Sequence, residues 1–291
     1  MTLVHPVMKL KLFQARQILP VFLLALICFT ANAQKLPATQ QVSLWVPANI
    51  KVDGKTTEWG DKFQAYNPTS RIFYTVSNDD RNLYLTVRME DLFGNEKALN
   101  GGITFTVSPL PEKGQKRKDV KDISVTYPVI ENKYNSGREA FVVTVGNSSH
   151  YKSLSSDTDG NRKKIDSLVI KTNRRMTEMF KEVQVAGIKE IADPIISIYN
   201  ATGILVAAQF NESMKYTYEM AIPIKYLGTS IKDGGQFKYN IRLNATPTIA
   251  TIVSSNLPGP PIASNLANVK PDILYVNYPT DFGGEYTLAK K

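Results

Sequence analysis

Cysteine and histidine are nearly absent from this 291-residue chain. It contains one cysteine, Cys28, and two histidines, His5 and His150. Because Cys28 and His5 lie near the N-terminus, the chain beyond them keeps His150 alone. That composition excludes disulfides, cysteine nucleophiles, thiolate zinc sites and paired-histidine metal motifs there. A Ser-His-Asp triad would have to use His150, which lies in a polar, serine-rich segment.

Residues 1–33 have the features of a secretory signal peptide. They contain a basic start, an apolar segment at 18–30, and the small-residue sequence Ala31-Asn32-Ala33. The apolar segment is short for a membrane anchor and is soon followed by polar residues. We therefore expect cleavage after Ala33, a secreted or periplasmic protein, and no transmembrane segment after cleavage.

Positive charge is in modest excess in the mature chain. The signal peptide holds three basic and no acidic residues, so its removal reduces the net charge from +9 to +6. One basic cluster, at 113–118, lies in a segment flanked by proline and glycine. An excess of this size is typical of solubility rather than of nucleic-acid binding, so we expect no nucleic-acid partner.

Short segments in which apolar and polar residues alternate dominate the mature chain. In the segment 82–90, Leu83, Leu85, Val87 and Met89 share one parity, which is the pattern of a half-buried strand. The predicted strands are residues 42–46, 71–77, 82–90, 103–107, 123–130, 140–145, 182–191, 195–199, 204–210, 215–222, 236–245 and 285–288. Residues 167–171 are a further strand candidate.

Long helical patterns are not evident. Residues 91–102 and 147–164 are polar without an apolar period and predict loops, and 174–180 predicts one helical turn at most. About ten short strands separated by turn residues indicate one all-β, antiparallel β-sandwich with long loops and little helix. We expect a signal peptide at 1–33, a polar lead-in at 34–41 and the sandwich domain at 42–291.

Four short motifs occur in a characteristic order. They are Asp53-Gly54 with Trp59, Asn78-Asp79-Asp80 before Leu83-Tyr84, Glu219 to Pro223 with Leu227, and Phe282-Gly283-Gly284. In this order the chain resembles the family 9 carbohydrate-binding modules and the wider DOMON-like sandwiches. The resemblance implies a jelly-roll type of β-sandwich in a secreted bacterial protein, with a glycan as the expected partner.

The chain departs from that family at the residues that clamp sugar. The family uses exposed tryptophans, one before the strand matching 103–107 and one before the closing strand. Here 92–102 contains Phe93 but no tryptophan, and 254–281 contains tyrosines but no tryptophan. Gly101-Gly102 replaces the acidic residue that usually begins the strand at Ile103. Trp45, in the first predicted strand, is interpreted as a packing residue.

Five residues are candidate ligand contacts: Phe93, Tyr127, Asn240, Arg242 and Asn244. Aromatic rings stack on sugar faces, and amide or guanidinium groups hydrogen-bond to hydroxyls. The three residues on 236–245 share the polar parity of that strand, so a solvated sheet face is the alternative interpretation.

One segment has the alternating oxygen ligands of a calcium loop: Asp157, Asp159 and Asn161. It lacks the later bidentate glutamate, since Lys163 and Lys164 follow. We expect no cofactor, with calcium at this segment as the exception to be tested.

The sequence favours a non-enzymatic, secreted module that recognises a glycan or another polar ligand. The alternative is a structural or protein-interaction domain of the cell envelope with no small-molecule ligand. A hydrolase would need paired carboxylates, a metal or an activated nucleophile, and the adjacent acidic residues here lie in turn-like segments. We therefore expect no enzyme.

Overall fold

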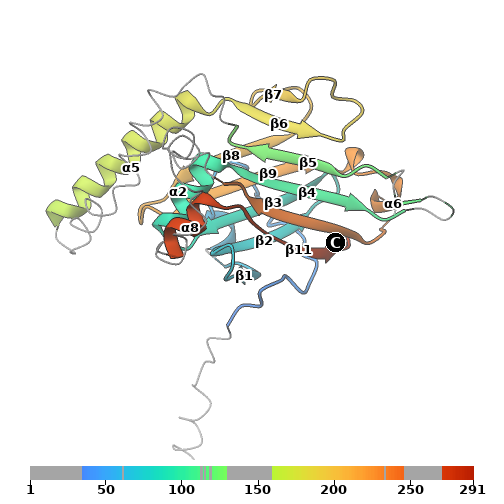
Figure 1. Cartoon of the computed structure of the whole chain (residues 1–291), viewed down its shortest axis with the longest axis horizontal. Helices are drawn as coiled ribbons and strands as arrows, with labels where there is room; N and C mark the ends of the chain where they lie inside the picture. The colour runs from blue at the N-terminus through green and yellow to red at the C-terminus, as the bar shows by residue number, and fades with distance from the viewer. Residues whose placement is uncertain are drawn as a thin grey trace, which may run out of the picture. The chain divides into compact units, whose positions relative to one another are not determined.

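Two antiparallel sheets form the body of the protein (Figure 1). The computed structural model describes residues 35–291 except 61, 112–113, 115, 118–119, 130–158, 233 and 246–270. Within it, Pro37–Lys291 form one compact unit. The β-sandwich predicted from strand alternation is confirmed at this level.

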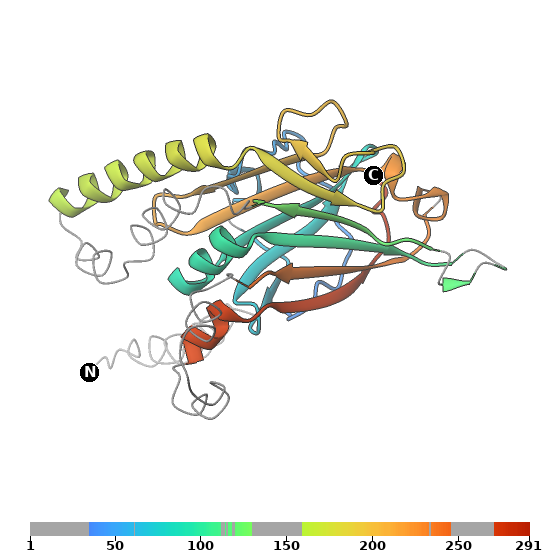
Figure 2. The same ribbon diagram turned by 45° about the horizontal axis from the view of Figure 1, so that its top comes forward.

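Sheet A has five strands and sheet B has six. In spatial order, sheet A consists of β1 (Ala65–Asn67), β2 (Ile72–Asn78), β3 (Asn82–Met89), β9 (Tyr216–Pro223) and β8 (Leu205–Phe210). Sheet B consists of β11 (Thr280–Tyr286), β10 (Phe237–Leu243), β4 (Ile103–Pro109), β5 (Ile123–Tyr127), β6 (Glu182–Ala186) and β7 (Ile195–Ser197). Figure 2 shows the two sheets as stacked layers.

The core lies between the inward faces of the two sheets. The four apolar residues that alternate along β3 are buried there, as are Phe237, Tyr239, Ile241 and Leu243 of β10. Each such side chain contributes about 1.5–3 kcal/mol when it leaves water. The core also contains polar bonds between the layers, since the hydroxyls of Tyr74 and Tyr239 lie 3.3 Å apart.

The N-terminal segment 40–54 covers part of the outer face of sheet A. Val46 packs with Tyr84 and Ala221, and Trp45, Ile50 and Val52 pack against this small cluster. All eight residues of β9 are consequently buried, on both faces of the sheet. Residues 42–46 do not form the predicted strand. They contribute one isolated parallel bridge, between Trp45 and Asn78.

Most other strand predictions are confirmed with small shifts in their limits. The strands β5, β6, β7 and β10 are shorter than predicted by two to five residues, and β3 and β8 by one residue each. The closing strand β11 begins earlier than predicted, at Thr280. The predicted strand at 140–145 lies outside the described residues.

The prediction of little helix was wrong at residues 159–179. They form the helix α5 (Asp159–Met179), and 167–171 is therefore not a strand. Leu168 and Val169 follow Ile165 by three and four residues, and Met176 follows Val169 by seven, so all four lie on one side of the helix and pack against the core. The exposed Ile170, beside Val169, makes the sequence look strand-like.

The predicted loop at 91–102 is also helical. Here α2 (Leu92–Gly101) begins at Asp91, whose Oδ1 accepts a hydrogen bond from Gly94 N at 2.8 Å. It ends at Gly102, which has φ of +75°. A Cβ on Gly101 would lie 2.2 Å from Asn244 O. Only glycine therefore allows this helix end to pack so closely against the segment that follows β10.

The remaining helices are short. They are the 3₁₀ turns η1 (Thr57–Trp59) and η4 (Ile224–Tyr226), and the helices α6 (Thr229–Lys232) and α8 (Pro271–Asn277). None of the helices in the described part of the chain is long and apolar enough to cross a membrane.

Candidate functional site

Three predicted ligand residues lie together on the outer face of sheet B. Asn240 Nδ2 donates to Asp281 Oδ2 at 3.0 Å, and Arg242 is exposed between its strand neighbours on β4 and β11. Asn244 Nδ2 donates to Thr104 Oγ1 at 3.0 Å. This polar face presents donors and acceptors, but its outward positions on the six strands carry no aromatic residue.

The other two predicted residues lie elsewhere. Tyr127 points between the sheets, is 5 % exposed, and has its ring centroid 6.2 Å from that of Tyr218. Its hydroxyl donates to Phe180 O at 3.3 Å. Phe93 is half-buried in the first turn of α2, whereas the opposite end of α2 adjoins Asn244. The structure therefore does not bring these two aromatic rings to the polar face.

The predicted calcium ligands are described only in part. Asp157 lies outside the described residues, while Asp159 and Asn161 lie in the first turn of α5. Among the described residues, no group of three or more His, Cys, Asp or Glu side chains is placed to hold a metal ion. The calcium site stays a prediction.

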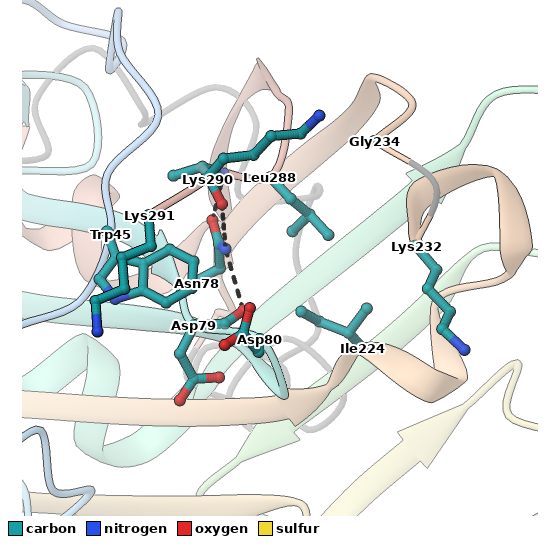
Figure 3. A pocket seen from close by; sticks show the side chains of 11 residues that line it. Trp45, Asn78, Asp79, Asp80, Ile224, Lys232, Gly234, Leu288, Lys290 and Lys291 are labelled. Atoms are coloured by element: carbon teal, nitrogen blue, oxygen red, sulfur yellow. Dashed lines mark hydrogen bonds between the residues drawn. The ribbon is translucent and has the colours of Figure 1, made fainter.

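A pocket of about 310 Å³ lies at the end of the β2–β3 hairpin (Figure 3). We name it the Trp45 pocket. Its walls come from the N-terminal segment, the hairpin turn, the η4–α6 region and the C-terminal segment. The lining residues are Trp45, Asn78, Asp79, Asp80, Ile224, Lys232, Gly234, Leu288, Ala289, Lys290 and Lys291.

Asn78 joins the segments that form the pocket. Its Oδ1 accepts hydrogen bonds from Tyr286 OH at 3.0 Å and from Ala289 N at 2.7 Å. Its Nδ2 donates to Ala289 O at 3.1 Å. On the other side, Val46 N donates to Asn78 O at 3.0 Å, which places Trp45 beside the turn. One buried asparagine thus positions two walls of the pocket.

The carboxylate of Asp79 stabilises the turn between β2 and β3. Its Oδ1 accepts from the backbone N–H groups of Arg81 and Asn82, both at 2.7 Å. Its Oδ2 accepts from the Tyr84 hydroxyl at 2.9 Å. Burial raises the pKa of Tyr84 to about 12, so the hydroxyl remains a donor at neutral pH. Three hydrogen bonds therefore fix the carboxylate of Asp79 in place.

Asp80 and Trp45 are the groups of the pocket that can meet a ligand. Asp80 is exposed, and its carboxylate has no hydrogen-bond or ion-pair partner among the described residues. Figure 3 places Trp45 and Asp79 on one side, Ile224 and Lys232 on the other, and Asp80 between them. The pocket thus combines an aromatic wall, a carboxylate that can accept hydrogen bonds, and two aliphatic side chains. Such a lining suits a ligand ring that is apolar on one face and carries hydroxyl groups.

Sequence reasoning missed this pocket because its parts are distant in the sequence. The sequence predicts the Asn78-Asp79-Asp80 turn and a packing role for Trp45. The indole of Trp45 does pack on the small cluster, and it also lines the pocket. The parallel bridge that brings Trp45 to Asn78 has no local sequence signal.

A second charged cluster lies at the opposite end of β2, around Arg71. Its Nη1 is 3.1 Å from Asp91 Oδ2 and 2.7 Å from Asp272 Oδ1. Arg71 and Lys97 lie 4.4 and 4.2 Å from the centroid of the Tyr275 ring. Lys97 is fully buried, and this burial lowers its pKa to about 8. These groups satisfy one another and attach α8 to α2.

No family model, curated protein or solved structure matches the chain.

Proposed function

We propose that this protein is a secreted or periplasmic, non-enzymatic module that binds one saccharide unit of a glycan in the Trp45 pocket. The observation that carries the proposal is a pocket of about 310 Å³ lined by the Trp45 indole and by the Asp80 carboxylate, which has no partner within the described part of the chain. That volume is at the small end of ligand pockets and suits a single sugar ring.

The physical argument rests on the two faces of a sugar. The C–H groups on one face of a pyranose ring suit an aromatic wall, while its hydroxyls donate to carboxylates. Trp45 supplies the first and Asp80 the second. Because Asn78 and Asp79 fix the walls by hydrogen bonds, little ordering entropy is lost when a ligand binds.

The resemblance to family 9 modules supports the same assignment and the jelly-roll type of fold that we propose. Two of its motifs touch across the structure. The backbone N–H groups of Asp53 and Gly54 donate to Glu219 Oε2 at 3.1 and 3.0 Å. Gly54 has φ of +81°, as the Asp-Gly turn requires. These motif residues serve the scaffold, and the proposed sugar site lies apart from them.

The test is calorimetry with a panel of monosaccharides and disaccharides on protein exported by a bacterial host. Amino-terminal sequencing of that protein is expected to begin at Gln34. Trp45→Ala is expected to weaken binding at least tenfold, or about 1.4 kcal/mol. Asp80→Ala, which removes an exposed side chain without a packing role, is expected to weaken it several-fold.

Arg242→Ala is the matched control, because Arg242 is exposed on the polar face of sheet B. The polar face is a second candidate for the glycan, favoured by the hydrogen-bonded series Asn244, Thr104 and Thr126. If Arg242→Ala weakened binding while Trp45→Ala and Asp80→Ala did not, the site would be the polar face. Absence of binding to every sugar, with a stable protein complex recovered instead, would favour an interaction domain of the cell envelope.

A further inference from the structure

We infer that two copies of this protein associate edge to edge through β8, with the two β8 strands antiparallel, so that their sheets A form one continuous sheet. In the spatial order of sheet A, β8 is the last strand, with β9 on one side and no strand on the other in the described part of the chain. An edge strand presents backbone groups that can bond to another strand.

The hydrogen bonds of the β8–β9 hairpin show which backbone groups face this open edge. Asn211 N donates to Lys215 O at 3.0 Å, so the bonds to β9 are made at Asn211 and at every second residue before it. The N–H and C=O groups of the alternate residues, Phe210, Ala208 and Val206, therefore point away from β9.

The side chain of Asn173 in α5 already occupies one end of the edge. Its Nδ2 donates to Phe210 O at 2.8 Å, and its Oδ1 accepts from Phe210 N at 2.7 Å, as a neighbouring strand would do. Among the described residues, the outward groups of Val206 and Ala208 have no such partner. The free part of the edge thus consists of these two residues on either side of Ala207.

This free part is complementary to itself. When Ala207 faces Ala207 of the partner subunit across a two-fold axis, each Val206 lies opposite Ala208 of the partner subunit. Each such pair exchanges two hydrogen bonds between N–H and C=O groups. A register that used Phe210 would have to displace Asn173, so the structure favours the register centred on Ala207. The result is a closed two-fold dimer.

The side chains of β8 also suit an identical partner. The strand has no charged residue and no proline, so it lacks the features that usually prevent pairing at an edge, and two copies meet without charge repulsion. Leu205 is 46 % exposed at the start of the strand. Pairing removes part of this apolar side chain from water, which stabilises the dimer.

The experiment introduces single cysteines into exported protein, from which Cys28 is expected to be removed with the signal peptide. In the proposed register the two copies of residue 207 form a pair without mutual backbone bonds, with Cα atoms about 4.5 Å apart, which a disulfide can span. Ala207→Cys is expected to give mostly covalent dimer after treatment with oxidised glutathione. Leu205→Cys is the matched control, because the two copies of residue 205 lie roughly 14 Å apart, and it is expected to stay uncrosslinked.

A second variant tests the hydrogen bonds across the edge. Ala208→Pro removes an N–H group that points away from β9, a position at which edge strands tolerate proline. Sedimentation velocity over a range of protein concentrations is expected to show dimerisation weakened by about tenfold or more, with an unchanged circular dichroism spectrum.

Each outcome decides the inference. A monomer at every concentration, a dimer that Ala207→Cys does not cross-link, or equal cross-linking by Leu205→Cys would overturn it, as would a folded Ala208→Pro protein that dimerises as tightly as the native one. If Ala208→Pro failed to fold, the two cysteine variants would still decide, because they keep every backbone group of β8. None of these results depends on saccharide binding in the Trp45 pocket.

Discussion

Glu219 is a side chain whose ionisation opposes the fold. It is 2 % exposed beneath Asp53-Gly54, and its Oε1 has no hydrogen-bond partner within the described part of the chain. Burial raises the pKa of Glu219 to about 8, although the two backbone N–H groups at Oε2 act in the opposite direction. The folded protein therefore binds this proton more tightly than the unfolded chain, in which a glutamate titrates near 4.3. Stability must decline as the pH rises between these two values.

Glu219→Gln should remove this decline. The amide oxygen can still accept from Asp53 and Gly54, but the side chain no longer ionises. Relative to the native protein, the free energy of unfolding of the variant is expected to improve by about 2–4 kcal/mol between pH 5 and pH 9. Urea unfolding of both proteins at several pH values measures this difference in the free energy of unfolding.

Glu212→Gln is the control for this experiment, because Glu212 is an exposed carboxyl near β9. Its pH dependence is expected to match that of the native protein. An unchanged pH profile in Glu219→Gln would mean that water or a shift of the Asp53-Gly54 turn relieves the buried charge.

At the scale of elements, most strands were predictable from the sequence, whereas helix α2 was not. A strand such as β10 buries one parity, so its apolar residues alternate in the sequence. The buried residues of α2 are instead mostly small or polar and give no apolar period: Gly94, Asn95, Lys97, Ala98, Leu99 and Asn100. Asn95 replaces hydrophobic contacts by bonding Met214 O at 2.7 Å and Tyr216 N at 3.0 Å. Such long-range polar bonds have no local signature.

The N-terminal end of α2 provides a test of how this polar helix is held. Asp91 caps it through Oδ1 and pairs with Arg71 through Oδ2. Asp91→Ala is expected to lower the free energy of unfolding by about 1–2 kcal/mol, mostly through the lost cap, because the ion pair is partly exposed. Urea unfolding checks this value.

The matched control is Asp166→Ala, at an exposed position of α5. Its expected effect is within about 0.5 kcal/mol. A loss of similar size in both variants would show that the cap of α2 contributes nothing specific.

At the scale of the whole molecule, the two sheets are unequal. The outer face of sheet A is partly covered by 40–54, whereas sheet B presents a polar face with Lys238 and Arg242 exposed. The alternation of apolar and polar residues in 236–245 predicts the exposed polar face of sheet B. The cover over sheet A was not predictable, because a segment without regular strand pairing carries no periodic pattern. The same segment, 40–54, also places Trp45 in its pocket. The candidate site and the stability of sheet A therefore depend on one segment.

Deletion of residues 34–49 is expected to affect both properties at once. It removes Val46 from Tyr84 and Ala221, and it removes Gln40, whose side chain bonds the backbone of Val76 at 2.7 and 2.8 Å. We expect the thermal midpoint to fall by about 5–10 °C, stronger binding of a hydrophobic dye to the uncovered sheet, and loss of saccharide binding. Deletion of 34–36, which precede the compact unit, should leave all three measurements unchanged. If the longer deletion lost saccharide binding at an unchanged thermal midpoint, the segment would serve the site alone, and the outer face of sheet A would be stable without its cover.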